Sequence, residues 1–366
     1  MLTKGDDYPI HQTPDPIAFA GTERNFYDRY FFNGYSADGT MFFVFALGVY
    51  PNLNIMDAGF AVRIGDLQYN LRASRHLNME RMDIQVGPIR VEILEPLKRL
   101  RLIIDDNQHG IAADLVFEGR HDPIEETRSI RRNGPRITMD FTRLTQLGRY
   151  SGWLRAGGQD IHAEQAGVIG SRDRSWGMRA VGLRDPQEMV PPPSRQFHWY
   201  WVPAHLEDRV LHFYINEDEH GAIWHRDFVM VHDDGRVEHL HAATIAVTAH
   251  KGTRWPASAV ISAFDETGAA YRVTIEAGDR TYLSGIGYMH PEWGHGFNKG
   301  PLAIGYDEIR KADVAEYGPP WLHSEAFARL TMVTPDGRSI SGSGTFEALS
   351  MGPNAGRGYT GMFDAP

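Results

Sequence analysis

The sequence predicts an all-β fold made of two antiparallel lobes, each a barrel or a sandwich. Short segments in both halves of the chain alternate apolar and polar residues with a period of two, which is typical of half-buried strands. Clusters of Gly, Pro, Asn and Asp separate these segments at short intervals, as in antiparallel sandwiches and barrels rather than parallel βαβ units. Helical periodicity is scarce, and only residues 307–314 are expected to form a short helix.

Length and composition limit the classes of function. A chain of 366 residues is long enough for two domains. The net charge of -10 argues against nucleic acid or an anionic membrane surface as the main partner. The absence of cysteine excludes disulfides, a thiolate nucleophile and cysteine-ligated metals. No apolar window is long enough for a membrane span, and the polar residues 1–15 do not resemble a signal peptide, so we expect a cytoplasmic protein.

The first half begins with a proline-containing segment, residues 8–19, which is expected to be an extended lead-in. An aromatic run from Asn25 and the apolar run Met41–Tyr50 flank Asp38-Gly39 and predict a hairpin. Further strands are expected at 61–64, 67–72, 84–86, 89–94, 100–104 and 113–119. The polar stretch 120–136 predicts an exposed connector, and strand character resumes over 141–158.

The second half shows the same alternation. Strands are expected at 197–202, 210–216, 222–231, 237–240, 244–248, 259–264, 271–276 and 341–349. Turns are expected at 233–235, 266–268 and 335–337, where Asp or Thr precedes Gly. Two halves of similar length, each a run of short strands, indicate two barrel-like lobes.

A charged motif lies in the middle of the chain, from Gly170 to Arg179. Four charged side chains and Trp176 fall within these ten residues. One interpretation is a surface loop in which Asp173 pairs with its arginine neighbours. The other is the wall of a partly enclosed site, which Trp176 favours because a large aromatic beside ion-pairing groups suits such a wall.

A second cluster of polar and aromatic residues lies between glycines at Gly285 and Gly300. It contains Tyr288, His290, Glu292, Trp293, His295 and Lys299. Backbone freedom and proton-transfer groups coincide here, and histidine can act as acid or base near neutral pH, oriented by Glu292 or Tyr288. The alternative is a surface Ω-loop whose polar side chains are satisfied.

The eight tryptophans all follow residue 152. Strand alternation over 197–201 places Phe197, Trp199 and Trp201 on one face and His198 and Tyr200 on the other. One face is expected to be core, and the other to line a cavity suited to a large apolar ligand. The alternative is that these tryptophans are simply core residues.

Motifs for metal binding, nucleotide binding and serine hydrolysis are either absent or lack the sequence context that they need. His290 and His295, or His239 and His241, invite a zinc interpretation, but no His-Glu-x-x-His pattern is present, so we expect no metal. Residues 356–361 match G-x-G-x-x-G without a following helix, and no P-loop or G-x-S-x-G is present. No cofactor is therefore expected.

Three stretches resemble the hydroxyneurosporene synthase (carotenoid 1,2-hydratase) or AttH-like superfamily. They are G-x-R-D-R-S-W-G-x-R at 170–179, His-Pro-Glu-Trp-Gly-His-Gly at 290–296, and Gly-Tyr-Ser-Ala-Asp-Gly at 34–39. The resemblance implies two lipocalin-like lobes packed side by side, residues 1–165 and 166–366. It also implies cofactor-free protonation chemistry on a lipophilic substrate: hydration, cyclisation, isomerisation or carbon-carbon cleavage. An acidic chain without a membrane segment suits a terpenoid, steroid or lignin-type aromatic better than a carotenoid.

The resulting hypothesis is a hydratase-like or carbon-carbon lyase that works by acid-base chemistry. The candidate catalytic residues are Asp173, Tyr288, His290, His295 and Lys299. The candidate substrate-binding residues are Trp176, Trp199, Tyr200, Trp201 and Trp293. The supporting residues are Arg172, Arg174, Arg179, Glu164 and Glu292, with the arginines structural because three cannot face an apolar substrate without a steep desolvation cost.

Three alternatives remain: an isomerase or cyclase on the same substrates, a zinc-dependent hydrolase, and a lipophile-binding protein without catalysis. In a binding protein, Asp173 and His290 should be locked in ion pairs or face solvent. A homodimer is left open.

Overall fold

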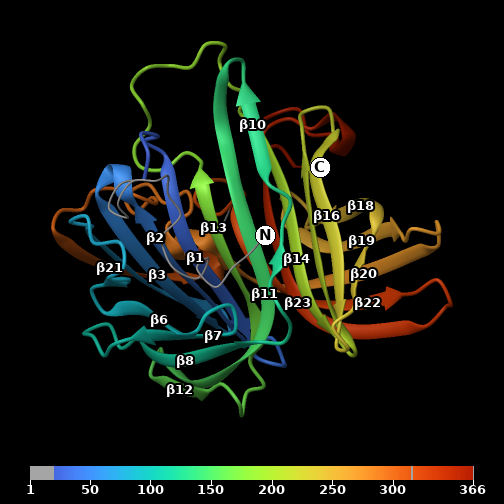
Figure 1. The fold of residues 1–366 in the computed structure, drawn as a ribbon, viewed down its shortest axis with the longest axis horizontal. Helices are drawn as coiled ribbons and strands as arrows, with labels where there is room; N and C mark the ends of the chain where they lie inside the picture. The colour runs from blue at the N-terminus through green and yellow to red at the C-terminus, as the bar shows by residue number, and fades with distance from the viewer. Residues whose placement is uncertain (1–19, 315, 366) are drawn as a thin grey trace. The chain divides into compact units, whose positions relative to one another are not determined.

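The computed structural model describes residues 20–314 and 316–365, so the expected lead-in at 8–19 lies outside the described residues. The predicted all-β class is confirmed (Figure 1). Within the described ranges the regular elements are strands and short 3-10 helices, without an α-helix. None of these elements is a helix long and apolar enough to cross a membrane.

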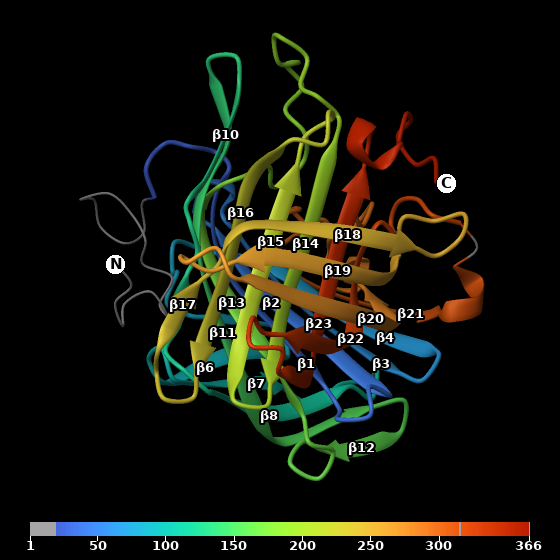
Figure 2. The same ribbon diagram turned by 90° about the vertical axis from the view of Figure 1, so that its right-hand side faces the viewer.

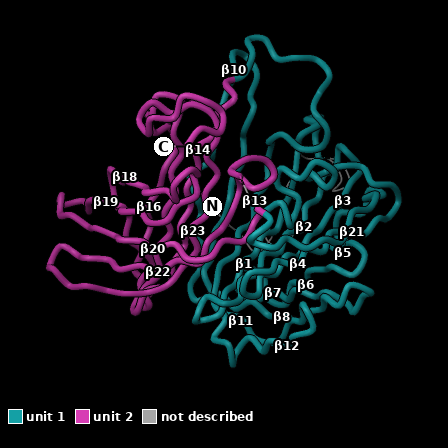
Figure 3. The backbone as a smooth tube through the Cα atoms, turned by 180° about the vertical axis from the view of Figure 1, so that it is seen from behind, with its two compact units in different colours: residues 1–193, 283–313 teal, residues 194–282, 314–366 magenta. Residues whose placement is uncertain are grey.

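The chain divides into two compact units (Figure 3). Unit 1 comprises residues 1–193 and 283–313, and unit 2 comprises residues 194–282 and 314–366. These units differ from the expected lobes, which divide after residue 165. The charged motif and the second cluster both belong to unit 1, although residues 194–282 of unit 2 lie between them in the sequence.

Unit 1 is a curled antiparallel sheet with the strand order β21-β4-β3-β2-β1-β13-β11-β8-β7-β6-β5. Its strands are β1 (Phe26–Tyr35), β2 (Met41–Tyr50), β3 (Ile55–Ile64), β4 (Leu67–His76), β5 (Gln85–Val86), β6 (Ile89–Glu95), β7 (Arg99–Ile104), β8 (Ala112–Gly119), β11 (Arg136–Ala156), β13 (Ile169–Met178) and β21 (Leu302–Arg310). Strands β9 (Ile124–Glu125), β10 (Ser129–Asn133) and β12 (Gln159–His162) pair with β11. Because β5 and β6 also contact β3, the sheet is nearly closed into a barrel.

The interior of the unit 1 barrel is filled by alternate residues of these strands. Phe43 and Phe45 of β2 and Phe60 of β3 pack there, and all three are fully buried. Burying a side chain of this size contributes roughly 1.5–3 kcal/mol. The residues at the alternate positions of the same strands, such as Asp57 of β3, face the outer side of the sheet.

Unit 2 is a second antiparallel sheet, with the order β17-β16-β15-β14-β23-β22-β20-β19-β18. Its strands are β14 (Phe197–Leu206), β15 (Arg209–Glu217), β16 (Ile223–His232), β17 (Val237–His239), β18 (His241–Ala249), β19 (Pro256–Phe264), β20 (Ala270–Tyr282), β22 (His323–Val333) and β23 (Ser339–Met351). Figure 2 shows β18, β19 and β20 side by side. Contacts between β16 and β18 bring the two ends of this sheet together around its own core.

Four segments differ from the sequence-based expectations. The polar stretch 120–136 contains β9 and β10 in place of a bare connector. The charged motif is not a loop but most of the central strand β13, which pairs with β1 and β11 along its length. The expected helix at 307–314 is wrong, because β21 continues to Arg310 by pairing with β4 and only the 3-10 helix η4 (Lys311–Asp313) follows. Strand β22 was not expected. In each segment tertiary pairing outweighs weak local preference.

Candidate functional site

The outer face of strands β1 to β4 is covered by a segment from late in the chain, residues 283–301. Its 3-10 helix η3 (Leu283–Ile286) packs directly on β3, where a Cβ added to Gly59 would lie 2.8 Å from the Cα of Ile286. The guanidinium of Arg72 donates to the carbonyl of Ser284 at 3.1 Å, and the hydroxyl of Ser74 donates to the carbonyl of Phe297 at 3.3 Å. We call residues 283–301 the covering segment.

Asp57 lies at the centre of the covered face. Its Oδ2 accepts a hydrogen bond of 2.6 Å from the backbone N–H of Gly296, and its Oδ1 accepts one of 3.1 Å from the hydroxyl of Tyr50. Gly48 lies opposite Asp57 on β2 and lets the Tyr50 hydroxyl reach the carboxyl, because a Cβ at Gly48 would lie 2.2 Å from that oxygen.

The protonation of Asp57 is shifted by its surroundings. Burial raises the pKa of the Asp57 carboxyl to about 6, against the lowering effect of the Gly296 N–H and of Arg29. Burial, together with the charge of Asp57, raises the pKa of Tyr50 well above its usual value, so Tyr50 stays a donor. Asp57 therefore changes its charge close to neutral pH, which is the range in which a general acid or base is effective.

Arg29 and His295 hold the covering segment beside Asp57. Nη2 of Arg29 lies 3.1 Å from Nε2 of His295, which lies 3.0 Å from the carbonyl oxygen of Ile286. The rings of Tyr288 and His295 meet edge to face with centroids 4.5 Å apart, and the Arg29 guanidinium lies 4.6 Å from the Tyr288 ring centroid. Arg179 lies 5.8 Å from the same ring, so the end of the charged motif meets the second cluster here.

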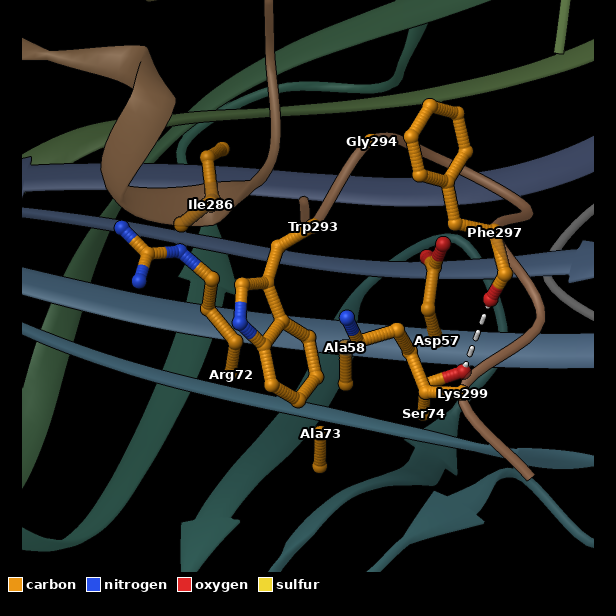
Figure 4. A pocket seen from close by; sticks show the side chains of 10 residues that line it. All are labelled: Asp57, Ala58, Arg72, Ala73, Ser74, Ile286, Trp293, Gly294, Phe297 and Lys299. Carbon is orange, nitrogen blue, oxygen red and sulfur yellow. Dashed lines mark hydrogen bonds between the residues drawn. The ribbon is translucent and has the colours of Figure 1, made fainter. Parts of the chain in front are cut away.

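A small cavity adjoins Asp57 on this face (Figure 4). Its volume of about 10 Å³ is room for about one water molecule. Figure 4 shows the Trp293 indole flanked by Arg72 and Lys299. Nζ of Lys299 lies 5.0 Å from the Trp293 ring centroid, and no ion pair of Lys299 is found among the described residues. The cavity thus combines a carboxyl, an ammonium group and an aromatic wall.

Arg72 is neutralised by Asp307 on the neighbouring strand β21. Nη1 of Arg72 lies 2.8 Å from Oδ2 of Asp307, and the Arg72 side chain is almost fully buried. Burial opposes ionisation of Asp307, but the nearby His290 ring and the hydrogen bonds from Arg72 outweigh it and hold the pKa of Asp307 well below its usual range. Arg72 and Asp307 therefore form a neutral pair, which leaves Lys299 as the cation available to a molecule in the cavity.

His290, a predicted catalytic residue, is hydrogen-bonded within a turn of the covering segment. Its Nδ1 accepts hydrogen bonds of 3.1 Å from the backbone N–H groups of Glu292 and Trp293. Its Nε2 lies 3.8 Å from Oδ2 of Asp307. His290 does not line the cavity, and Glu292 is exposed at the surface of the turn that this ring stabilises.

The residues of β13 point to both faces of the sheet. Arg172 and Arg174 face the barrel interior, where Nε of Arg172 donates to Oε1 of Gln146 at 2.8 Å and Arg174 pairs with Asp28. Asp173 points to the opposite face of the sheet and is partly exposed. Asp173 does not line the Asp57 cavity.

The remaining candidates do not line this cavity. Oε2 of Glu164 accepts a hydrogen bond of 3.1 Å from the Gly152 N–H at an exposed position. In unit 2, Tyr200 is part of the barrel core, whereas Trp199 and Trp201 pack with Tyr214 on the opposite face, as alternation predicted. The cavity is lined by residues of unit 1 alone, so Trp293 is the predicted substrate-binding residue that reaches it. Trp176 lies in a separate hollow of unit 1.

Sequence reasoning missed Asp57, Tyr50, Arg29 and Arg72. One signal was available for Asp57, which is the single charged residue in the otherwise apolar run Ile55–Val62. A carboxylate within a buried strand needs partners or a function. Among the described residues, no three His, Asp or Glu side chains are grouped so that they could hold a metal ion.

Two solved structures are similar to this chain. An AttH-like protein from Nitrosomonas europaea is similar with a TM-score of 0.52 and 13% sequence identity, covering 89% of this chain and 92% of that chain. Kievitone hydratase from Nectria haematococca is similar with a TM-score of 0.47 and 11% identity, covering 88% of each chain. The first likeness shows the fold, a two-lobed all-β architecture of the AttH type, which confirms that part of the expected resemblance. The relation to hydroxyneurosporene synthase stays a prediction.

The sequence assigns the chain to a particular family. Residues 2–360 match a family of unknown function (DUF8625), and the chain belongs to that family. No curated protein sequence matches it.

Proposed function

We propose that the protein is an acid-base lyase of the hydratase type, with Asp57 as the proton-transfer group. The observation that carries this proposal is a carboxyl with a pKa of about 6 beside a cavity the size of one water molecule. A hydratase needs these two components together: a group that gains and loses a proton near neutral pH, and a place for the water that is added.

The charges around the cavity favour addition of water to a carbon-carbon double bond conjugated with a carbonyl group. The Asp57 carboxylate accepts a proton from the water while the water oxygen bonds to the β-carbon. The π electrons of the double bond move onto the carbonyl oxygen. The Lys299 ammonium stabilises that developing negative charge. Protonated Asp57 then gives its proton to the α-carbon, so that one water has been added and the enzyme is restored. The reverse sequence eliminates water.

Other residues position these groups. Gly296 and Tyr50 orient the carboxyl, while Arg29 and His295 hold the covering segment over it. Trp293 supplies an aromatic wall against the mainly apolar substrate skeleton, of the terpenoid, steroid or lignin type. The scheme uses side chains and water alone, so cofactor-free chemistry is part of the proposal. A molecule larger than water reaches Asp57 only when the covering segment moves.

The proposal is tested by incubating the protein with two simple enones, cyclohex-2-enone and chalcone, in D₂O and in H₂¹⁸O. Mass spectrometry would detect deuterium at the α-carbon and ¹⁸O at the β-carbon. We expect Asp57→Asn to abolish incorporation and the exposed substitution Asp66→Asn to leave it unchanged. Incorporation by a folded Asp57→Asn variant at the wild-type rate would exclude Asp57 as the proton-transfer group.

A second candidate is a binding protein without catalysis, which one observation favours. His290 is locked between two backbone donors and Asp307, as expected of a carrier. In that case the enones would bind without isotope incorporation. The cytoplasmic location expected from the sequence stays a prediction.

A further inference from the structure

A second and larger hollow lies in unit 1, at the end of the barrel where β1 begins and β13 ends. It is an open groove of about 380 Å³, a size typical of small-molecule sites. Its apolar lining comes from Phe26, Phe141, Trp176 and Met178. None of these residues lines the Asp57 cavity, so the two hollows are separate sites.

The floor of the groove is formed by three neighbouring strands. Met178 of β13 pairs with Phe26 of β1 and with Asp140 of β11. One step further in, Trp176 pairs with Thr142 of β11. These side chains lie on one face of the sheet, because paired residues and residues two apart in a strand share a face. Three strands about 4.8 Å apart span roughly 10 Å, which is broad enough for two fused aromatic rings.

The charged residues that line the groove neutralise each other. Nε of Arg128 donates to Oδ1 of Asp140 at 2.6 Å, and Nη2 donates to Oδ2 at 2.7 Å. One guanidinium thus engages both carboxylate oxygens, and the lining carries no net charge. An ionic ligand loses hydration when it packs against the rings, and no unpaired charge of the lining compensates for that loss. The lining therefore favours an uncharged molecule.

Cations of the protein already lie near two rings of the groove. The guanidinium of Arg81 lies 5.8 Å from the centroid of the Phe26 ring, and that of Arg143 lies 5.4 Å from the centroid of the Phe141 ring. These charges would repel a cationic ligand placed on the same rings. Neither guanidinium lines the groove, so an anionic ligand gains no direct contact with them.

Thr142 adds one hydrogen-bonding group to this apolar surface. It lines the groove and lies beside Trp176 on the neighbouring strand. No hydrogen bond of its hydroxyl is found within the ranges 20–314 and 316–365. A hydroxyl both donates and accepts hydrogen bonds, so it can pair with either a carbonyl or a hydroxyl group of a ligand.

We propose that the groove binds a neutral planar aromatic molecule that carries a hydroxyl or carbonyl group. The rings pack against Trp176 and Phe26, and Met178 adapts to their shape. The polar group of the ligand forms a hydrogen bond with the hydroxyl of Thr142, beside the indole. This inference concerns a site separate from Asp57 and does not depend on the function proposed for that residue.

A series of naphthalene derivatives tests the proposal, because its members differ in one substituent. At pH 7, 2-naphthol is neutral, 2-naphthoate is an anion and 2-naphthylmethylammonium is a cation. Isothermal titration calorimetry of the full chain should show one-to-one binding of 2-naphthol, about tenfold tighter than that of either ion. An ion that binds as tightly as 2-naphthol, or a lack of binding by 2-naphthol, would overturn the proposal.

Variants of the lining locate the bound molecule. Trp176→Ala should weaken the binding of 2-naphthol about tenfold, whereas Asp57→Asn should leave its affinity unchanged. Thr142→Val removes the hydroxyl, so it should weaken 2-naphthol about fivefold and leave the affinity for 2-methylnaphthalene unchanged. Near-ultraviolet circular dichroism shows that each variant is folded. A folded Trp176→Ala variant with wild-type affinity would show that the groove is not the site.

Met178→Lys tests the charge argument inside the groove without removing an aromatic ring. The new ammonium group supplies the positive charge that the lining lacks, so 2-naphthoate should then bind more tightly than 2-naphthol. An unchanged order of affinities in the folded variant would show that these molecules bind elsewhere.

Discussion

The backbone N–H of Gly296 donates a hydrogen bond of 2.6 Å to Oδ2 of Asp57, although 239 positions separate the two residues in the sequence. This bond joins the covering segment to the outer face of β3 and helps to bury the carboxyl. The protonation of Asp57 and the position of the segment are therefore coupled. If the segment lifts, the carboxyl is rehydrated and its pKa falls toward the ordinary value.

Asp57 should make the protein less stable as the pH rises. Its folded-state pKa of about 6 is above the unfolded value, so the folded protein binds more protons between about pH 4 and pH 6. Over this range the wild type should lose at most about 3 kcal/mol in its free energy of unfolding. Asp57→Asn should remove this loss, and Asp66→Asn should retain it. Urea unfolding from pH 4.5 to 7.5 measures both, and equal slopes in wild type and Asp57→Asn would contradict the shift.

The proposed reaction should depend on the same ionisation. Because the Asp57 carboxylate accepts the proton from water, kcat/KM for hydration should rise with pH and level off above about pH 6. Lys299→Met should lower kcat more than it changes KM, since its charge matters mainly in the transition state. A pH-independent rate between pH 5 and 7 would argue against Asp57 as the base.

Gly305→Ala should disturb the cavity through its aromatic wall. A Cβ at this position would lie 2.4 Å from Cζ2 of Trp293, so the indole must move. We expect a loss of about 1–3 kcal/mol in stability, as for other overpacked sites, and a shift in tryptophan emission. Gly318→Ala is the matched control, because no atom lies within 4 Å of its Cβ. Unchanged emission and melting temperature in Gly305→Ala would show that the wall tolerates the methyl group.

Asp307→Asn should destabilise unit 1, because it leaves the buried guanidinium of Arg72 without its carboxylate partner. The expected cost is about 1–3 kcal/mol, less than for a fully buried pair because Asp307 is half exposed. Since the pKa of Asp307 is lowered, its contribution is lost as the pH falls, opposite in sign to that of Asp57. Asp313→Asn, at an exposed position nearby, is the control in thermal melts at pH 7 and pH 4.

Arg357→Lys should destabilise unit 2. Its guanidinium donates a hydrogen bond of 2.6 Å to each carboxylate oxygen of Glu217. Arg357 ends the 3-10 helix η5 (Ala355–Arg357), in the segment that matches G-x-G-x-x-G. Lysine cannot form this two-bonded pair, so we expect a loss of about 3 kcal/mol in the free energy of unfolding. Arg338→Lys changes an exposed pair with Asp208 and should cost less than about 1 kcal/mol. Equal effects in urea unfolding would refute the structural role of Arg357.

The strands were predictable wherever the local pattern was strong. The hairpin of β1 and β2 follows from two aromatic runs around Asp38-Gly39, and the facing of Trp199 and Tyr200 follows from alternation alone. The motif of β13 was interpreted either as a surface loop or as the wall of an enclosed site, and neither interpretation placed it in a central strand. Charged residues rarely occupy a central strand, and here side chains of the two neighbouring strands accommodate them, Asp28 of β1 for Arg174 and Gln146 of β11 for Arg172.

The sequence by itself determined the all-β class, most strand positions and the two clusters of candidate site residues, at 170–179 and 285–300. Alternation and turn residues are local properties, and they can be recognised within a few positions. Only the tertiary structure decided that Asp57, rather than Asp173 or His290, adjoins the cavity. Its raised pKa comes from burial by a segment more than two hundred residues away, and desolvation depends on which surfaces are covered in the fold.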